Sequence, residues 1–330
     1  MSRYKVGIAG GAGYTAGELI RILVNHPKTE LAFVQSESNA GNPVSDVHDD
    51  LLGICDLTFS AEPDLNVDIL FLCKGHGESV KFLGQHKVSS TTRIIDLSQD
   101  FRIEGSQQEL SKTYGGFVYG LCEMQPETIK QAHNIANPGC FATCIQLGLL
   151  PLAAENKIGD DVHVSAVTGS TGAGQGLSNT SHFSYRNNNL SIYKPFQHQH
   201  LKEVYQTLGN LQNGFNHQVN FIPYRGNFTR GILASIYLKS DLTTVEAREL
   251  FKTYYQNSEF VRISPKNVHL KQVVNTNNCF LYLEKFEDNL LVVSVIDNLL
   301  KGASGQAVQN MNLMLGIPEN TGLQLKATTF

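Results

Sequence analysis

The first half of the chain alternates short apolar runs with stretches of helical periodicity. Residues 3–10 form an apolar run that ends in glycine, and residues 15–26 repeat apolar positions at helical spacing until Pro27. Three further strands are predicted at 31–36, 67–74 and 93–98, and a helix at 78–85. Near-continuous apolar strands that alternate with helices are typical of a parallel sheet covered on both faces. The pattern therefore predicts an α/β unit in this half.

The second half has a different pattern. Strand-like runs follow one another more closely and lie at 162–168, 219–223, 231–239, 279–284 and 290–296. Helical stretches are predicted near 200–208 and at 244–256, and residues 303–315 return to helical periodicity. This succession predicts an α+β unit with a more antiparallel sheet.

Composition narrows the class of protein. The chain has 330 residues, of which 41% are apolar and 17% charged, as in ordinary globular proteins, and it is long enough for two domains. A net charge of -4 without a Lys/Arg run argues against nucleic-acid binding, and no apolar run is long enough to span a membrane. The first strand begins too early to leave room for a signal peptide, and the six cysteines are scattered. We therefore expect a cytoplasmic protein with reduced thiols.

Cys140 is the first candidate for chemistry. It follows Asn137-Pro138-Gly139, in which proline ends a preceding element and glycine allows a sharp turn into a helix. A thiol in the first turn of a helix faces unpaired N–H groups and the positive end of the helix dipole, which favour the thiolate nucleophile. The alternative is a small buried hydrophobe, which we expect for Cys144. No second ligand pair accompanies these two cysteines, so zinc is not expected.

Gly10-Gly11-Ala12-Gly13-Tyr14-Thr15 lies between the first strand and the first helix. Its glycine spacing departs from G-x-G-x-x-G, but small residues at this place let backbone N–H groups approach a pyrophosphate. A simple tight turn is the alternative. After the second strand, Ser36, Ser38 and Asn39 offer neutral hydrogen-bonding groups to a ribose 2′-phosphate, and Glu37 is expected to point away because strand side chains alternate. The sequence thus favours NADP over NAD.

Two other polar clusters are candidates. His198-Gln199-His200 is the densest histidine cluster, and histidine is the natural acid or base near neutral pH, although a solvated loop would also contain such residues. Residues 168–174, Thr-Gly-Ser-Thr-Gly-Ala-Gly, end a strand and offer N–H and O–H donors to a carboxylate or phosphate; a flexible loop is the alternative. Residues 302–307 resemble a second helix-opening glycine loop, which would bring the final helix back against the cofactor; a helix cap is the alternative.

Eight motifs follow one another along the chain. They are GIAGGAGYTAGEL at 7–19, DLSQDFR at 96–102, YGLCE at 119–123, NPGCFAT at 137–143, TGSTGAG at 168–174, HQHLKEV at 198–204, RGIL at 230–233 and DNLLKGASGQAVQNMNLMLG at 297–316. In this order they resemble the N-acetyl-γ-glutamyl-phosphate reductases, the arginine-biosynthesis relatives of aspartate-semialdehyde dehydrogenase. The resemblance covers essentially the whole chain.

The resemblance implies a Rossmann-type NADP-binding domain at residues 1–145, to which residues 303–330 return, and an α+β catalytic and dimerisation domain at 146–302. It implies reduction of an N-acyl-γ-glutamyl phosphate by NADPH through a cysteine thioester, the third step of arginine and ornithine biosynthesis, in a homodimer or homotetramer. Aspartate-semialdehyde dehydrogenase itself and a catalytically silent NADP(H) sensor are the alternatives.

Residue by residue, Cys140 matches the nucleophile of the family. The family motif His-Arg-His followed by Pro-Glu has become His198-Gln199-His200-Leu201-Lys202-Glu203, which keeps both histidines and loses the arginine and the proline. His198 is taken as the acid/base, although the motif does not separate it from His200. The family loop Ser-Gly-Val-Ser-Gly-Ala-Gly-Arg ends here in Gln175, so a second arginine is lost and the acyl group, acetyl or succinyl, stays open.

The resemblance also implies that further residues contact the ligands. The cofactor would meet, besides the glycine loop and the two serines, a further four residues: Lys74, Gly75, Gly172 and Asn310. The substrate would meet five: Arg102, Asn137, Ser170, Thr171 and Tyr193.

Overall fold

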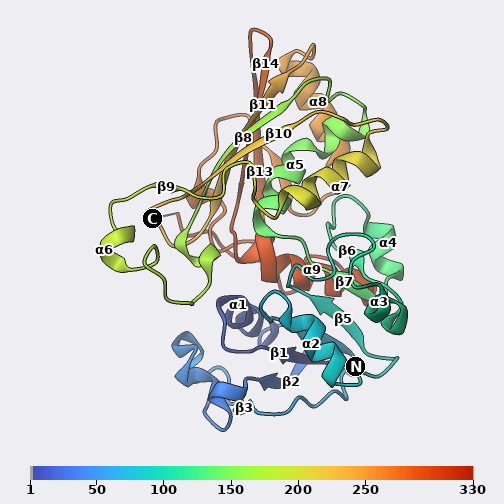
Figure 1. Cartoon of the computed structure of the whole chain (residues 1–330), viewed down its shortest axis with the longest axis vertical. Coiled ribbons are helices and arrows are strands. Elements are labelled where there is room, and N and C mark those ends of the chain that lie inside the picture. The colour runs from blue at the N-terminus through green and yellow to red at the C-terminus, as the bar shows by residue number, and fades with distance from the viewer. Residues whose placement is uncertain (1–2, 330) are drawn as a thin grey trace. The chain divides into compact units, whose positions relative to one another are not determined.

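The structure is a computed structural model that describes residues 3–329. The chain forms two compact units: the residues up to Pro138 with Ala303–Gln324, and Gly139–Gly302 with the residues from Leu325 onward (Figure 1). Within the described residues, no helix combines the length and the apolar character needed to cross a membrane.

The first unit contains a seven-stranded sheet in the order β3-β2-β1-β4-β5-β7-β6, with every neighbouring pair parallel. The strands are β1 (Tyr4–Ala9), β2 (Thr29–Gln35), β3 (Phe59–Ser60), β4 (Ile69–Leu72), β5 (Arg93–Asp96), β6 (Val118–Tyr119) and β7 (Asn134–Ala136). The helices are α1 (Tyr14–Leu23), α2 (Glu78–Gln85), α3 (Gln108–Tyr114), α4 (Pro126–Gln131) and α9 (Gly305–Met314). The strand order reverses between β1 and β4, and nucleotides bind at the carboxyl ends of strands at such a reversal.

The last helix, α9, belongs to this first unit, as expected. All ten of its residues are buried, and it packs against α1 and α4. The Ser304 hydroxyl donates to the carbonyl of Thr15 at 2.7 Å, the His26 ring contacts Asn312 at 3.2 Å, and Arg93 donates to the carbonyl of Met314. These contacts hold the returning segment on the nucleotide unit.

The second unit contains a mixed seven-stranded sheet in the order β12-β13-β14-β11-β8-β10-β9. The strands are β8 (Val162–Thr168), β9 (Ser191–Ile192), β10 (Val219–Arg225), β11 (Ile232–Lys239), β12 (Val261–Ile263), β13 (Cys279–Phe286) and β14 (Asn289–Ile296). Only the pairs β8/β10 and β12/β13 are parallel, so the predicted antiparallel character is confirmed.

Helices α5 (Cys140–Ala154), α7 (Leu201–Leu211) and α8 (Thr244–Tyr254) pack on this sheet, and the short α6 (Phe183–Arg186) lies apart from them (Figure 1). Helix α5 is mostly apolar, and its residues from Phe141 to Ala153 are buried, as in a helix that is enclosed by its own domain. The other face of the sheet has a separate apolar cluster around Val293 and Val295, which half-buried Leu233, Phe280 and Leu291 extend.

Two expected elements coincide with the structure in both bounds, the helix at 78–85 and the strand at 162–168. The second strand does not: it ends at Gln35, and Glu37–Asn39 form a 3₁₀ turn. The expectation that Glu37 points away because strand side chains alternate is therefore wrong in its reasoning, since these residues are not extended.

Candidate functional site

The nucleophile candidate stands at the start of the buried helix of the second unit. Gly139 is the N-cap residue in extended conformation, and Cys140 is the first helical residue and is half-buried. The N-cap residue is a glycine and makes no side-chain cap hydrogen bond, and the helix dipole acts on the Cys140 thiol and favours the thiolate. A Cβ placed on Gly302 would lie 2.8 Å from Cys140 Cβ, so glycine is needed for this close approach.

The two predicted histidines lie together beside this helix start. Both are buried, His198 at 5% exposure and His200 at 7%, and their ring centres are 4.6 Å apart. Phe141, the residue after the cysteine, packs edge-on to His198 at 5.3 Å and to His200 at 6.3 Å. The sequence cluster is therefore part of the packed interior around the cysteine and not a solvated loop.

Burial, with the positive charges of Lys194 and Arg225 nearby, lowers the pKa of His198 to about 4. The ring is therefore neutral at neutral pH. Its Nδ1 accepts a hydrogen bond from the backbone N–H of His200 at 3.3 Å, which assigns the proton of the neutral ring to Nε2. His198 can thus donate a hydrogen bond from Nε2.

Tyr193 completes the aromatic surroundings. Its ring centre lies 5.7 Å from that of His198 and 6.5 Å from that of Phe141. Burial raises the pKa of the Tyr193 hydroxyl, the charge of Cys140 raises it further, and Arg225 opposes the shift. Cys140, Tyr193 and His198 therefore share one environment within the second unit.

Two charged residues of this environment were not predicted. Glu203, 3% exposed on the first turn of α7, accepts a hydrogen bond from the backbone N–H of Gly139 at 2.9 Å. Arg225 ends β10 and stacks on Tyr193, with 4.7 Å between the guanidinium carbon and the ring centre. The glutamate was quoted in the histidine motif without a role. The arginine belongs to no sequence motif, and only the pairing of β10 with its neighbouring strands places it here.

The glycine loop lies at the strand-order reversal of the first unit. Gly10 has φ +87°, and a Cβ on it would lie 2.7 Å from the carbonyl oxygen of Cys73, so only glycine fits this turn. Gly10 and Gly11 donate to the carbonyl of Gln35, whereas Gly13 is the N-cap of α1, without a side-chain cap and with open space beside it. An uncapped helix start at this edge fits the pyrophosphate of a dinucleotide. Ala12 belongs to the same turn, and Tyr14 and Thr15 are the first two residues of α1.

The residues predicted for the 2′-phosphate gather after β2. Asn39 Nδ2 donates to the hydroxyls of both Ser36 and Ser38 at 3.1 Å, and the two hydroxyls are 3.5 Å apart. Glu37 is exposed, and its carboxylate accepts from Gln35 Nε2 at 3.4 Å. The Lys74 ammonium, which follows β4, donates to Gln35 Oε1 at 3.3 Å. The Lys74 ammonium and the Ser36 and Ser38 hydroxyls therefore lie near the end of β2. Gly75 follows Lys74 in the chain.

Three predicted ligand residues are engaged inside the first unit. Arg102, 6% exposed, donates to the backbone carbonyls of Asn137 and Leu97 at 2.8 and 2.9 Å. Asn137 Nδ2 donates to the carbonyl of Ala303, and its Oδ1 accepts from Asn310 Nδ2 at 3.1 Å. Both asparagines are about fully buried, so they position the segment before the cysteine rather than present free amide groups.

The loop after β8 belongs to the second unit. The backbone N–H of Ser170 donates to the carbonyl of Phe228, that of Thr171 to Thr229, and that of Gly172 to Gly169. The Thr171 hydroxyl also donates to the carbonyl of Thr229. A ligand at this loop would therefore meet side chains and not these amide groups.

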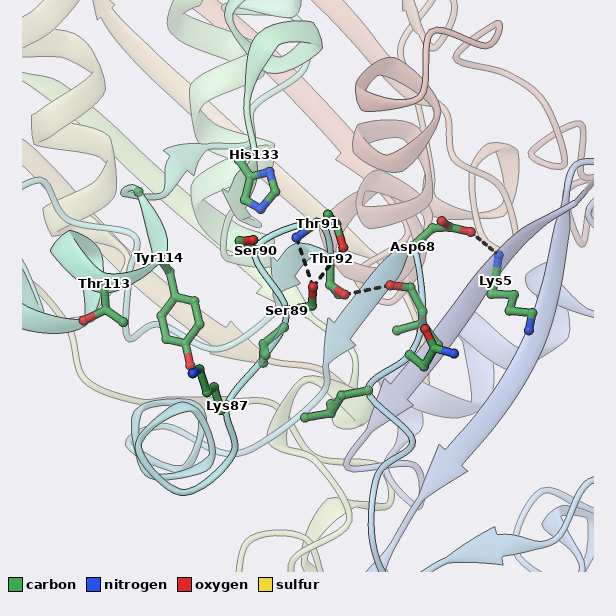
Figure 2. Close-up of a pocket in the computed structure, with 15 residues that line it drawn as sticks. Lys5, Asp68, Lys87, Ser89, Ser90, Thr91, Thr92, Thr113, Tyr114 and His133 are labelled. Atoms are coloured by element: carbon green, nitrogen blue, oxygen red, sulfur yellow. Dashed lines mark hydrogen bonds between the residues drawn. The ribbon is translucent and has the colours of Figure 1, made fainter.

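A cavity of about 950 Å³ lies at the opposite edge of the first sheet (Figure 2). Residues at or next to the amino ends of four strands line it: Lys5, Asp68, Thr92 and His133. Polar groups that line this cavity bond one another. The Asp68 carboxylate accepts from the backbone N–H of Lys5 at 2.7 Å, and the hydroxyls of Ser89 and Thr91 are 2.9 Å apart. Nucleotide sites lie at the carboxyl ends of strands, and the predicted site residues lie elsewhere.

All six cysteines are free thiols. Cys55, Cys122, Cys144 and Cys279 are buried, and burial raises the pKa of the thiols of Cys144 and Cys73. Among residues 3–329, no three His, Cys, Asp or Glu side chains gather as metal ligands would.

Two family profiles match the chain, one in each unit. The family "Semialdehyde dehydrogenase, NAD binding domain" matches residues 5–132, and "Semialdehyde dehydrogenase, dimerisation domain" matches residues 140–298. The first unit is thus a nucleotide-binding domain, and Cys140 is the first residue of the dimerisation match.

Curated relatives share the full length. N-acetyl-gamma-glutamyl-phosphate reductase from Parabacteroides distasonis is 55% identical and that from Bacteroides fragilis 54%, each over 99% of both chains. The enzyme of the same name from Flavobacterium johnsoniae is 52% identical over 98% of this chain and 99% of its own.

Solved structures share the fold at low identity. Aspartate semialdehyde dehydrogenase II from Vibrio cholerae has a TM-score of 0.71 at 15% identity, covering 96% of this chain and 99% of its own. The Candida albicans enzyme with NADP has a TM-score of 0.64 at 14% identity, covering 97% and 100%. Together with the full-length relatives, these matches show that the chain belongs to the N-acetyl-gamma-glutamyl-phosphate reductases of the semialdehyde dehydrogenase family.

Proposed function

We propose that this chain reduces N-acetyl-γ-glutamyl phosphate to N-acetylglutamate semialdehyde with NADPH, releasing phosphate, as a step of arginine biosynthesis. The observation that carries the proposal is the 55% identity with a reductase of this name over 99% of both chains. The placement of a half-buried cysteine at an uncapped helix start supports it, because acyl transfer to a protein thiol needs a thiolate.

In this proposal Cys140 is the nucleophile. Its sulfur forms a bond to the γ-carbonyl carbon, and the carbon–oxygen bond to phosphate breaks with its electron pair on the phosphate. The acyl group is then held as a thioester at the start of α5. The N–H groups of the first turn of that helix face the same place and favour the negative charge of both the thiolate and the phosphoryl group.

His198 is the proposed acid. Its neutral ring holds a proton at Nε2, from which it donates a hydrogen bond to the carbonyl oxygen that becomes negative when the thioester is reduced. The carbon–sulfur bond then breaks with its electron pair on sulfur, which releases the aldehyde and restores the Cys140 thiolate. His200 lies 4.6 Å away, between ring centres, and we propose that it shapes the substrate pocket. Holding the thioester in one orientation lowers the barrier by roughly 7–11 kcal/mol in well-aligned cases.

The nucleotide unit would hold the cofactor. The start of α1 would take the pyrophosphate, and Ser36, Ser38 and Lys74 stand where a 2′-phosphate requires neutral donors and a positive charge. When bound, NADPH supplies the hydride for the thioester carbonyl. The exposed Glu37 is a nearby group that would favour NAD instead.

We propose a homodimer or homotetramer in the cytoplasm, without a nucleic-acid or membrane partner, with domains at 1–145 plus 303–330 and at 146–302. The match to a dimerisation domain supports self-association. So does the half-buried apolar face around Leu233, Phe280 and Leu291, because such a sheet face is stabilised by a second apolar layer.

A substrate panel tests the proposal. In the reverse direction, the purified protein should reduce NADP⁺ only when both phosphate and N-acetylglutamate semialdehyde, or its N-succinyl analogue, are present. Preference for aspartate semialdehyde would assign the related dehydrogenase activity. Nucleotide binding without turnover on any of the three aldehydes would assign a sensor and refute the proposal.

A further inference from the structure

Arg225 lies among the side chains that surround Cys140 but has no role in the function described so far. It is the last residue of β10, paired in register with Thr168 of β8 and with Ser191 of β9. Its guanidinium stacks over Tyr193 and forms a hydrogen bond with the hydroxyl of that residue. Strand pairing therefore fixes an arginine at the edge of the candidate site, within the second unit.

The positive charge of Arg225 is incompletely paired. Its Nε is buried and has no hydrogen-bond partner within the residues that the structure describes. Tyr193 and His198, its neighbours, are both uncharged at neutral pH, and Lys194 adds a second positive charge to the same environment. A guanidinium that is partly removed from water is costly unless an acceptor supplies the missing partner, and an anion is the acceptor that also compensates the charge.

Two other sets of donors in the second unit are already engaged. Arg230, five residues further, forms an ion pair with the buried Asp297, with 3.0 Å between Nη2 and the carboxylate oxygen. The amide N–H groups of Ser170 and Thr171 donate to the carbonyls of Phe228 and Thr229 in the loop between β10 and β11. Arg225, unlike Arg230, thus has no acidic partner among the residues that the structure describes.

We propose that Arg225 binds a carboxylate of the acyl-glutamyl substrate. A planar guanidinium binds a carboxylate through two parallel hydrogen bonds, and every N-acylglutamate carries such a group on its α-carbon. An N-succinyl chain carries one more. The phosphoryl group is the competing anion, but it is bonded to the carbon that Cys140 attacks and so belongs at the start of α5, where N–H groups face it. This assignment rests on the proposed function.

The reverse reaction separates the two anions, because aldehyde and inorganic phosphate are then different substrates. In Arg225→Gln, the KM for N-acetylglutamate semialdehyde should rise roughly 10- to 100-fold, the usual effect of losing a charge-assisted pair. The KM for phosphate and for NADP⁺ should change less than about twofold. The KM of Arg225→Lys for the aldehyde should lie between those of the wild type and Arg225→Gln, since lysine keeps the positive charge but lacks the paired N–H donors of a guanidinium.

The N-succinyl aldehyde identifies which carboxylate is bound. Equal losses for the acetyl and succinyl aldehydes assign the α-carboxylate, and a loss confined to the succinyl aldehyde assigns the distal one; both support the proposal. An unchanged KM for both aldehydes would overturn it, as would a rise confined to the KM for phosphate.

Arg248→Gln is the matched control. Arg248 also stacks on a tyrosine, 5.6 Å from the ring centre of Tyr282, and donates to the carbonyl of Leu283 far along the sheet. The Arg248→Gln variant should have the same KM as the wild type for the aldehydes, phosphate and NADP⁺. Calorimetry with N-acetylglutamate and N-succinylglutamate tests binding without turnover. If the wild type shows no turnover but binds one of them more tightly than Arg225→Gln, only the proposed function fails. If neither compound distinguishes the two proteins, the Arg225 assignment fails.

Discussion

Gly302→Ala should disable the nucleophile without unfolding the protein. The added methyl carbon would lie 2.8 Å from Cys140 Cβ and 3.2 Å from Cys140 Cα, whereas carbon atoms pack at about 3.5–4.0 Å. A shortfall of about 1 Å against such rigid atoms costs roughly 1–3 kcal/mol of folding free energy. Because the sulfur is bonded to this Cβ, it must move as well, and a shift of about 1 Å can lower the rate ~10²-fold.

Three measurements on Gly302→Ala check this reasoning: kcat/KM, the rate of alkylation of Cys140 by iodoacetamide, and the free energy of unfolding in denaturant. Gly209→Ala is the control, because Gly209 is inside α7 and a Cβ there meets nothing within 4 Å. It should keep full activity and gain roughly 0.5–1 kcal/mol of stability. A Gly302→Ala protein with wild-type kcat/KM and alkylation rate would refute the argument.

Four further results are expected. Cys140→Ser should abolish reduction while nucleotide binding persists, and turnover by the serine variant would rule the assignment out. Iodoacetamide should modify Cys140 faster than the buried Cys144, unless acyl phosphate protects Cys140. His198→Asn should lower kcat roughly 10²–10⁴-fold and His200→Asn should mainly raise the KM for substrate; the converse would exchange their roles. Steady-state assays should give a kcat/KM at least about tenfold higher with NADPH than with NADH, about 1.4 kcal/mol, and equal values would assign the turn after β2 to NAD. Burial raises the pKa of Asp96 to about 6, although hydrogen bonds from neighbouring serines oppose the shift. The stability that the protonated carboxyl group contributes below pH 3.8 is therefore lost as the pH rises through 6. Relative to Asp96→Asn, the wild type should lose on the order of 3 kcal/mol of unfolding free energy between pH 4 and 7.5, and parallel pH profiles would contradict this.

Long, strongly patterned elements were predictable from the sequence. Helix α2 and strand β8 have their apolar residues at one clear period, and both are found at the predicted bounds. The two-residue strands β3, β6 and β9 were missed, because two residues carry no periodicity and only tertiary pairing makes them strands. The short helices α3 and α4 were missed because seven and six residues make less than two helical turns, too few for a clear periodicity.

The candidate site was predictable where local sequence determines local geometry. Asn-Pro-Gly before Cys140 requires a turn into a helix, and the cysteine is indeed the first residue of α5. The neighbours of that cysteine come from distant strands and helices, so no local pattern indicates them. Arg225 is a single charged residue at a strand end, and Glu203 is one helical charge among many. The catalytic and ligand roles of the predicted residues stay predictions.

The burial of the thiols determines how the protein responds to oxidants. Cys140 is half-buried at an uncapped helix start, whereas Cys144, one turn on, is fully enclosed and its thiol is held protonated. A sulfenic acid formed on Cys140 would thus find no thiolate at Cys144 to capture it as a disulfide, and oxidation would proceed to the irreversible sulfinic acid. Cys73 is half-buried as well, but burial raises the pKa of its thiol, so a thiolate-selective label should count the Cys140 thiols and hence the competent enzyme, and oxidised preparations should take up less than one equivalent.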